Sequence, residues 1–252
     1  MYGVILAAGS SERLKPLTKK IPKTLLRINN VSLLERIINN TYEYLKTYIF
    51  VVGHGADAVN LEIEDMKQKY DFKSILVFNP KYSTANNCYS LYLAIRFLLD
   101  NNMLDDIVVI NSDDIFDKRI FLRLIKESRK TMYSILIIDM EKQLGEEEMK
   151  VKVQEGKIVK ISKNIPLQEA SGEFIGISLI KKEYLSPLKS SLENIMAVNP
   201  NLYYEDAFQQ MIDLGYTFEY ITTGGLFWNE IDTLDDLKET ERKIKIIEGN
   251  IA

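Results

Sequence analysis

The stretch that decides the fold lies near the start of the chain, where residues 3–18 read GVILAAGSSERLKPLT. Residues 4–6 are a short apolar run of the kind that forms a buried strand. The small residues that follow leave the backbone accessible, so that a ligand can lie directly against it. Arg13 and Lys23 bring two cations to the same loop, and this combination suits a polyphosphate, because N–H groups and cations bind its oxygens. The residues expected to line this phosphate-binding loop are Leu6, Ala7, Ala8, Gly9, Ser10 and Ser11.

Two common phosphate-binding loops do not fit this stretch. A dinucleotide-binding fingerprint needs three spaced glycines that open directly into a helix. Here the second and third glycines are missing, and Pro16 and Pro22 disfavour a helix. A Walker A loop needs a glycine immediately before its lysine, whereas Lys23 follows Pro22. An NAD-dependent oxidoreductase is therefore a weak alternative.

The composition fits one large domain that is free in the cytoplasm. A chain of 252 residues with 46% hydrophobic residues can bury a full core. The net charge of −4 argues against a nucleic-acid-binding protein, which usually presents a basic face. We expect neither a secretory signal nor a membrane span, because no apolar run has the required length or flanks. The one cysteine, Cys88, excludes an intramolecular disulfide, and we expect a cytoplasmic protein.

The first half of the chain alternates between short β-branched runs and helical periods. Strands separated by helices of this length predict an α/β fold with a mostly parallel central sheet and a Rossmann-like arrangement. In such sheets ligands bind at the carboxyl ends of the strands, where the opening loop lies together with residues 79–87 and 111–116. The expected strands span residues 3–6, 48–52, 74–78, 107–110 and 133–138, and the expected helices span residues 33–45, 58–69, 89–99 and 119–128.

The second half of the chain shows a different order of predicted strands and helices. Two short runs around Glu155-Gly156 predict a β-hairpin with a tight turn. Further strands are expected at residues 174–180 and 217–222, and helices at residues 182–194, 204–214 and 233–248. We therefore expect one domain, with a nucleotide-binding half at about residues 1–140 and an α+β half at about residues 141–252 that covers the open side of the sheet. The acidic residues 143–149 are interpreted as a surface loop.

Two aspartates follow an apolar strand near the middle of the chain. They are Asp113 and Asp114, within the segment of residues 111–116. A carboxylate at the carboxyl end of a strand, facing a phosphate-binding loop, suits a Mg²⁺ ligand. Turns rich in aspartate also form without a metal, and these residues alone do not decide which aspartate would bind one.

These motifs resemble those of the sugar-phosphate nucleotidylyltransferases, in order and over residues 3–237. The opening loop with Lys23 is similar to the family's signature loop, with Ser11 at a position that is usually glycine. The resemblance implies the nucleotide-diphospho-sugar transferase fold and Mg²⁺-dependent transfer of a nucleotidyl group to a phosphorylated acceptor, with release of pyrophosphate. It also implies three catalytic cations: Arg13 and Lys23 would hold the triphosphate, and Lys163 would hold the acceptor phosphate.

Two further motifs carry the metal ligands that the resemblance implies. Residues 111–116 are similar to a Gly-Asp-x-x-Phe/Tyr element, with Ser112 in place of the glycine and Asp113 as the metal aspartate. Residues 228–237 resemble the family's closing motif, Trp-x-[Asp/Glu]-[Ile/Val]-Asp-Thr-x-x-Asp-Leu, which makes Asp232 the second metal carboxylate.

Residues 79–91 resemble one branch of the family, the phosphocholine cytidylyltransferases, through an Asn-x-x-Tyr…Asn-Asn-x-Tyr-Ser-Leu segment. Asn and Ser side chains near a helix start can hydrogen-bond the edge of a base. We therefore expect Asn86 and Ser90 to bind the base, and CTP to be the nucleotide. Helix capping by Asn86 or Asn87 is the alternative role.

The resemblance also implies a set of acceptor-binding residues: Glu173, Tyr204, Glu205, Asp206 and Trp228. Their acidic and aromatic character suits an acceptor that carries a cation beside its phosphate or phosphonate, as phosphocholine does. Structural roles are open for some of them, because carboxylates stabilise a helix N-terminus and Tyr204 could equally belong to the core.

Two other functions remain open from the sequence. A sugar-1-phosphate nucleotidylyltransferase that uses UTP or dTTP would share most of these motifs. A catalytically silent, nucleotide-binding regulatory module would share the fold, but we would expect it to have lost a cation or a metal carboxylate, and this chain keeps them all.

Overall fold

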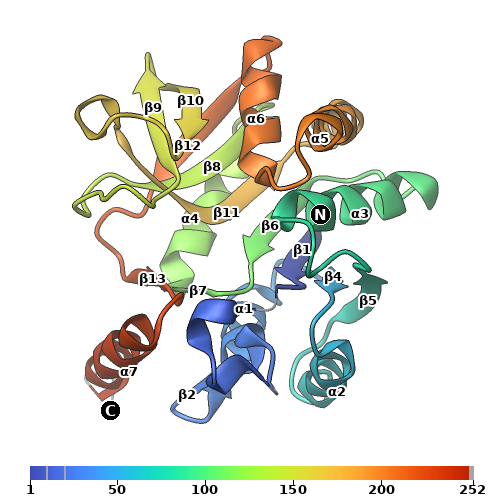
Figure 1. Ribbon diagram of the computed structural model, residues 1–252, viewed down its shortest axis with the longest axis vertical. Coiled ribbons are helices and arrows are strands. Elements are labelled where there is room, and N and C mark those ends of the chain that lie inside the picture. Colours follow the sequence, from blue (N-terminus) through green and yellow to red (C-terminus); the bar gives the residue numbers. More distant parts are fainter. Residues whose placement is uncertain (10, 20, 250–252) are drawn as a thin grey trace.

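The computed structural model describes residues 1–9, 11–19 and 21–249, and it shows an α/β protein built around one large sheet (Figure 1). Within these residues nine strands form the sheet in the order β5-β4-β1-β6-β11-β8-β12-β10-β9. In chain order they are β1 (Tyr2–Ala7), β4 (Thr47–Val52), β5 (Lys73–Phe78), β6 (Ile107–Asn111), β8 (Ser134–Asp139), β9 (Lys150–Gln154), β10 (Lys157–Ser162), β11 (Gly172–Ile180) and β12 (Phe218–Thr222).

Four strands of the first half form a parallel block. β1 pairs with β4 on one side and with β6 on the other, and β4 pairs with β5. Each crossover contains a helix, as the sequence predicted, so the Rossmann-like arrangement is confirmed. The helices of this half are α1 (Leu33–Thr41), α2 (Ala56–Met66), α3 (Asn87–Asp100) and α4 (Lys118–Ser128).

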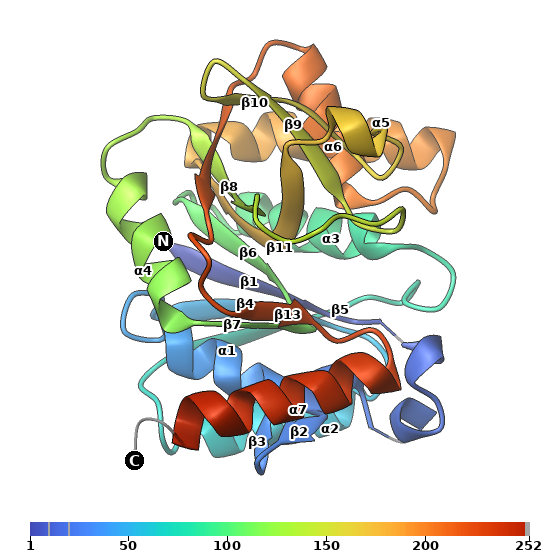
Figure 2. The ribbon, with the colours of Figure 1, turned by 90° about the vertical axis from the view of Figure 1, so that its left-hand side faces the viewer.

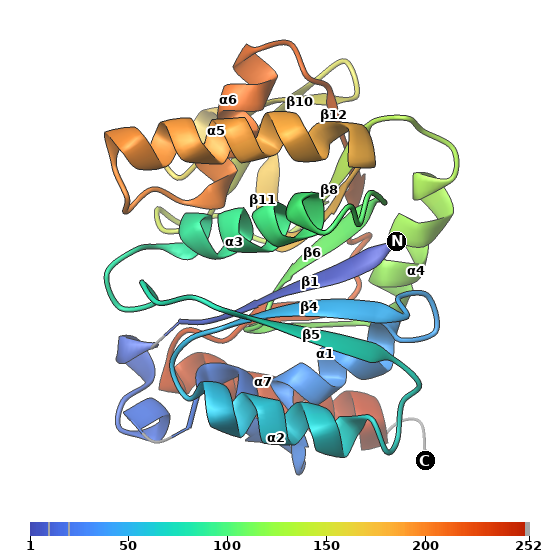
Figure 3. The same cartoon turned by 90° about the vertical axis from the view of Figure 1, so that its right-hand side faces the viewer.

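The two faces of the sheet are buried by different helices (Figures 2 and 3). Successive side chains of β1 alternate between them: Val4 and Leu6 belong to one core cluster, and Ile5 and Ala7 to the other. α3 packs on the first face together with α5 (Leu185–Val198) and α6 (Tyr204–Asp213). α1, α2 and α4 pack on the second face.

The second half of the chain both extends and covers this sheet. β11 runs antiparallel between β6 and β8, so that strands from the second half continue the sheet of the first. β12 is parallel to β8 and pairs with β10 of the predicted hairpin. The other strand of the hairpin, β9, pairs in turn with the start of β11, so these strands close back on themselves. The expected cover is supplied by α5 and α6, which pack against α3.

Most predicted elements end within a few residues of their observed ends, and two differences have a local cause. α1 ends at Thr41 rather than at residue 45, because the next residues form a turn in which the Tyr44 and Leu45 amides both donate to the Thr41 carbonyl. α5 begins at Leu185 rather than at residue 182, which places Pro187 in its first turn, where a missing N–H costs little.

A small antiparallel ribbon, which the sequence did not predict, joins the middle of the chain to its end. β7 (Asp114–Phe116) pairs with β13 (Trp228–Glu230), while β2 (Arg27–Ile28) pairs with β3 (Val31–Ser32). After β13, α7 (Leu234–Gly249) lies beside β2 and β3 (Figure 2). A third core cluster, which includes Leu14 and Ile244, fixes it against the segment that follows β1. None of the described helices is long and apolar enough to cross a membrane.

Candidate active site

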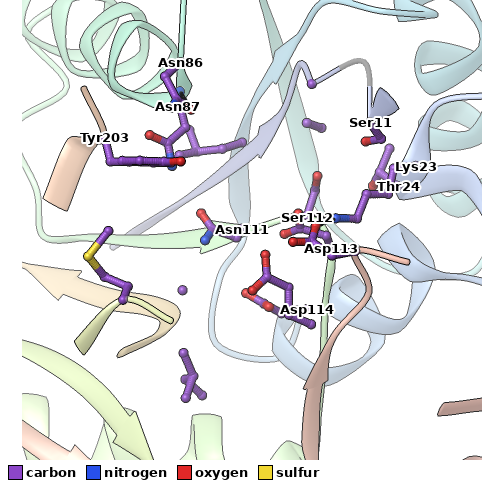
Figure 4. Close-up of a pocket in the computed structure, with 18 of the residues that line it drawn as sticks. Ser11, Lys23, Thr24, Asn86, Asn87, Asn111, Ser112, Asp113, Asp114 and Tyr203 are labelled. Atoms are coloured by element: carbon purple, nitrogen blue, oxygen red, sulfur yellow. Dashed lines mark hydrogen bonds and ion pairs between the residues drawn. The ribbon is translucent and has the colours of Figure 1, made fainter. Parts of the chain in front are cut away.

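A cavity of about 680 Å³ opens at the carboxyl ends of β1 and β6. Its wall combines the opening loop, the ribbon of β7 and β13, the start of α3, and the loops around β9 and α6. Figure 4 shows Asn86, Asn87 and Tyr203 on one side of this cavity and Ser11, Lys23 and Asp113 on the other. The cavity therefore lies where the topology of an open parallel sheet predicts a ligand.

The opening loop lines the cavity as expected, with Leu6, Ala7, Ala8, Gly9 and Ser11 in its wall. Ser10 lies outside the described residues. A Cβ added to Gly9 would have no atom within 4 Å, so the backbone here is open to a ligand. Ser11 adopts a φ of +50°, a conformation that glycine tolerates better, which gives a physical reason for the glycine that the resemblance expects at this position.

The two predicted phosphate-binding cations meet the two predicted metal carboxylates. The Lys23 ammonium, which is buried, donates to Asp113 Oδ2 at 2.8 Å and to Asp232 Oδ1 at 2.5 Å. Arg13 contacts Asp232 Oδ2 at 2.7 Å. Burial disfavours the charged form of Lys23, but the two carboxylates outweigh it and raise the pKa of Lys23 above its usual value. Burial likewise opposes ionisation of Asp232, yet Lys23 and Arg13 hold the pKa of Asp232 below its usual value.

A third carboxylate, which the sequence analysis did not select, completes this cluster. Oxygen atoms of Asp113, Glu230 and Asp232 all lie within 4.8 Å of one another. The β7–β13 ribbon brings them together, and the Ile231 amide closes it by donating to the Asp113 carbonyl. Glu230 occupies the acidic third position of the closing motif, which was the available signal. The pKa of Glu230 is raised by desolvation and by the neighbouring charges of Asp113 and Asp232, and because part of this side chain is exposed, the two charges are the cause that the geometry supports.

The donor set of this cluster fits a hard divalent cation. It offers carboxylate oxygens, without a histidine or cysteine among the group. Oxygen ligands of this kind are preferred by Mg²⁺ over softer metals. A magnesium ion is therefore compatible with the residues present.

Asp114 does not belong to the cluster. Its side chain is buried, and its Oδ2 has no hydrogen-bond partner among the described residues. It packs against Gly176, which lies at a bulge in β11 with a φ of +76°, and a Cβ there would meet Asp114 Oδ2 at 2.3 Å. Burial raises the pKa of Asp114 well above its usual value. Of the two adjacent aspartates, the structure thus places Asp113 beside Asp232 and Glu230.

In the segment expected to bind the base, the side chains of Asn86 and Ser90 form hydrogen bonds within the protein. Asn86 caps α3 by accepting from the Asn87 amide at 2.8 Å, and its own amide donates to the Asn201 carbonyl at 3.2 Å. Both ends of the Asn86 side chain are thus engaged, as in the alternative role named above. Ser90 accepts from Asn79 Nδ2 at 2.9 Å and lines the cavity, so its hydroxyl proton can still serve a ligand.

The predicted acceptor residues divide into two groups. Glu173, Glu205, Trp228 and Lys163 line the cavity. Tyr204 does not reach it, because its ring is fully buried and packs edge-on against Phe174 and Phe208. The expected role of Tyr204 in acceptor binding is therefore wrong, and it is a core residue.

Asp206 is the second correction. It accepts from the Tyr203 amide at 2.8 Å at the N-terminus of α6 and is not part of the cavity wall. Asp206 is the third residue of α6, and its side chain folds back to bind the amide of the N-cap residue Tyr203, as in a capping box. The neighbouring aromatic residue that does line the cavity is Tyr203, which was not selected, and the Lys163 ammonium lies 4.9 Å from its ring centroid.

Glu205 is a further acidic residue of the cavity wall. It is buried, and its Oε2 has no hydrogen-bond partner among the residues that the structure describes. Burial is the main reason that the pKa of Glu205 rises to about 8, and hydrogen bonds from its own backbone amide and from Tyr204 oppose the rise, as does Lys163 to a smaller extent. This arrangement leaves an acceptor atom available to a ligand that donates a hydrogen bond.

The acidic loop at residues 143–149 is not simply a surface loop, as the sequence suggested, since Glu147, Glu148 and Met149 line the cavity. Its conformation depends on Lys150, whose side chain is fully buried at the start of β9. The Lys150 ammonium donates to the backbone carbonyl oxygens of Glu146 at 2.8 Å, Gly145 at 3.3 Å and Glu148 at 3.5 Å. The buried Lys150 ammonium thus stabilises the conformation of the loop through its backbone carbonyls.

Replacing Lys150 by methionine is expected to loosen this loop and lower the free energy of unfolding by about 1–3 kcal/mol, because three backbone carbonyls lose their common donor. Amide hydrogen exchange at Gly145 should accelerate more than exchange in the sheet, and Lys152→Met serves as the control. Lys152 pairs with Glu169 near the surface, so its loss should cost at most about 1 kcal/mol. Equal exchange and equal melting temperatures for the two variants would contradict the role of Lys150.

The chain is similar to known nucleotidyl transferases over most of its length. The sequence model of the nucleotidyl transferase family matches residues 2–245. The choline-phosphate cytidylyltransferase of Haemophilus influenzae is 27% identical over 249 residues, which cover 97% of each chain. The bifunctional IPC transferase and DIPP synthase of Aquifex aeolicus is 28% identical over 242 residues, and the match spans 95% of this chain but only 50% of that protein. The solved structure of the CTP:phosphocholine cytidylyltransferase of Streptococcus pneumoniae superposes with a TM-score of 0.75 at 25% identity, covering 97% of this chain and 99% of that one.

Proposed function

The chain belongs to the nucleotidyl transferase family, and on this premise we propose that it joins CTP to a small phosphorylated or phosphonate acceptor, with Mg²⁺ as cofactor and release of pyrophosphate. The observation that carries the proposal is the contact of Lys23 and Arg13 with the carboxylates of Asp113 and Asp232 inside one cavity. Two cations and two carboxylates thus lie together, which supports a shared site for a polyphosphate and a metal.

The reaction needs little acid–base chemistry from the protein. An ionised oxygen of the acceptor phosphate or phosphonate forms a bond to the α-phosphorus of CTP, and the bond from that phosphorus to the bridging oxygen of pyrophosphate breaks. Phosphate monoesters are largely ionised at pH 7, so no general base is required. Rate enhancement then comes from positioning and from neutralising charge.

The residues of the cavity divide these tasks. Asp113, Glu230 and Asp232 would hold Mg²⁺, which when bound neutralises phosphate charge and polarises the phosphorus–oxygen bonds. Arg13 and Lys23 stabilise the negative charge that grows on the departing pyrophosphate. Lys163, on the acceptor side, orients the attacking phosphate.

The acceptor end of the cavity favours a substrate with a cationic group. Its wall contains the carboxylates of Glu148, Glu173 and Glu205 together with the aromatic rings of Tyr203 and Trp228. Aromatic faces and carboxylates both attract an ammonium group, whereas a neutral sugar calls for amides and hydroxyls directed at its ring. Relatives that are named choline-phosphate cytidylyltransferases support the same choice of nucleotide and acceptor.

Pyrophosphate release, measured for CTP, UTP, dTTP and ATP against phosphocholine, 2-aminoethylphosphonate and glucose 1-phosphate, tests the proposal. The highest kcat/KM is expected for CTP with one of the two cationic acceptors, at least about tenfold above glucose 1-phosphate, since unpaired buried groups penalise the wrong substrate. Faster turnover of glucose 1-phosphate with UTP or dTTP would identify a sugar-1-phosphate enzyme instead. Binding of CTP without turnover of any acceptor would favour a silent regulatory module.

A further inference from the structure

One corner of the acceptor end is formed by the ring of Trp228 and the carboxylate of Glu173, and we name it the Trp228 subsite. Trp228 is held in place because its Nε1 donates to the carboxylate of Asp139, which is itself buried. Glu173 lies on β11, and its side chain is only 5% exposed. The subsite therefore has an aromatic face and a buried carboxylate, both in the cavity wall.

This subsite is already occupied by a cation of the chain itself. The Lys142 ammonium lies 4.9 Å from the centroid of the Trp228 ring and 3.2 Å from Glu173 Oε2. These are the two contacts that an ammonium group of a bound acceptor would make in the same place. Lys142 thus satisfies the subsite before any substrate enters.

The contact is one that a ligand can displace. Lys142 follows β8 on a loop, and 43% of its side chain is exposed. Its backbone amide and that of Glu141 donate to Asp139 Oδ1, which fixes the start of the loop but leaves the long side chain free to rotate. Since Lys142 is the exposed partner of this pair, its ammonium can move into solvent when another cation takes its place beside Glu173.

We propose that Lys142 is a tethered competitor for the cationic group of the acceptor, so that the acceptor binds only by displacing it from the Trp228 subsite. This proposal rests on the proposed function, since it assigns a cation to the acceptor. Lys142 then sets a threshold for acceptors: a weakly interacting group cannot displace it, while a quaternary or primary ammonium can. Lys142 is in this sense a specificity-determining residue.

The size of the effect follows from competition for one position. If the state in which Lys142 occupies the subsite is populated about 5 to 30 times more than the state in which the subsite is free, the affinity for a ligand is weakened by about the same factor. That range corresponds to about 1–2 kcal/mol at about 1.4 kcal/mol per tenfold change. Removal of the lysine ammonium should restore the lost affinity.

The chain offers a direct reporter, because Trp228 is its single tryptophan. Titration with phosphocholine, and separately with tetramethylammonium chloride, should change tryptophan fluorescence as the cation reaches the ring. Lys142→Met and Lys142→Gln are expected to bind both probes about 5- to 30-fold more tightly than the unmodified protein. Lys157→Met is the matched control, since the Lys157 ammonium lies over the Tyr133 ring at 5.8 Å outside the cavity wall, and it should bind like the unmodified protein.

Several outcomes would overturn the proposal. Unchanged affinity in both Lys142 variants would show that the lysine does not compete, and weaker binding would show that it contacts the ligand favourably instead. Fluorescence that responds to neither probe in any variant would exclude a cation in this subsite. The titration needs neither CTP nor turnover. Its result therefore tests the role of Lys142 even if the pyrophosphate-release assay rejects the proposed reaction.

Discussion

Asp232→Asn is expected to lower kcat for nucleotidyl transfer by about 10²–10³-fold while leaving the fold intact. Asp232 takes part in both proposed functions of the site. It contacts the cations Lys23 and Arg13, and it lies in the carboxylate cluster with Asp113 and Glu230. The asparagine keeps the size of the side chain but removes its charge. It should therefore weaken metal binding and release Arg13, while Lys23 keeps Asp113 as its charged partner. The measurement is steady-state pyrophosphate release at saturating CTP and acceptor, repeated over a range of MgCl₂ concentrations.

The control for this variant lies three residues further along. Asp235 is exposed in the first turn of α7 and contacts Lys238 at 3.4 Å, so Asp235→Asn should retain nearly full activity. Thermal melting of both variants separates loss of chemistry from loss of fold. Asp113→Asn is expected to behave like Asp232→Asn. Turnover near the unmodified rate in either of these two variants would remove that residue from the metal site.

Lys23→Met is expected to lower kcat by about 10²–10³-fold and to change the KM for CTP by less than about threefold. The reason is that charge on the departing pyrophosphate is greatest in the transition state, so a cation placed there acts mainly on kcat. Lys23 is suited to this task because it is buried and held by two carboxylates, and it remains protonated at any pH of interest since its pKa is raised. The methionine side chain keeps similar length and preserves packing against the opening loop.

Lys19→Met tests whether any lysine of this segment would have the same effect. Lys19 is exposed and does not line the cavity, so its loss should leave kcat and KM unchanged. A Lys23→Met enzyme with normal kcat and a raised KM would show that Lys23 binds the ground state only. A large loss of thermal stability without a kinetic defect would reduce Lys23 to a structural bridge between Asp113 and Asp232.

The sequence predicted the framework well because the relevant signals are local. Alternation in β1 sends Val4 and Ile5 to opposite core clusters, and the helical periods of the first half reappear as α1 to α4. The hairpin turn at Glu155-Gly156 was also predicted, because glycine favours a tight turn. In the structure both residues adopt positive φ angles, of +49° and +76°. Thr233 and Asp236 form a capping box at the start of α7, where the sequence predicts a helix, with the Thr233 amide donating to Asp236 at 2.7 Å.

The sequence by itself also selected residues that share one cavity, because motifs at the ends of parallel strands meet at one edge of a sheet. Tertiary structure decided which neighbours face that cavity. A single step along α6 separates Tyr204, which is in the core, from Glu205, which lines the site, since successive residues of a helix point about 100° apart. No motif fixes that angle where the helix start is uncertain by a residue.

Contacts between distant segments were likewise decided only by the folded chain. The pairing of β7 with β13 brings Glu230 to Asp113, and the bulge at Gly176 makes room for Asp114. The loop after β8 carries Lys142 across to Trp228. Local propensity contains no information on these pairs, because their free energy depends on burial and charge that exist only once the sheet has formed. The sequence therefore determined the chemistry that is available in this protein, and the tertiary structure determined which of its charges meet.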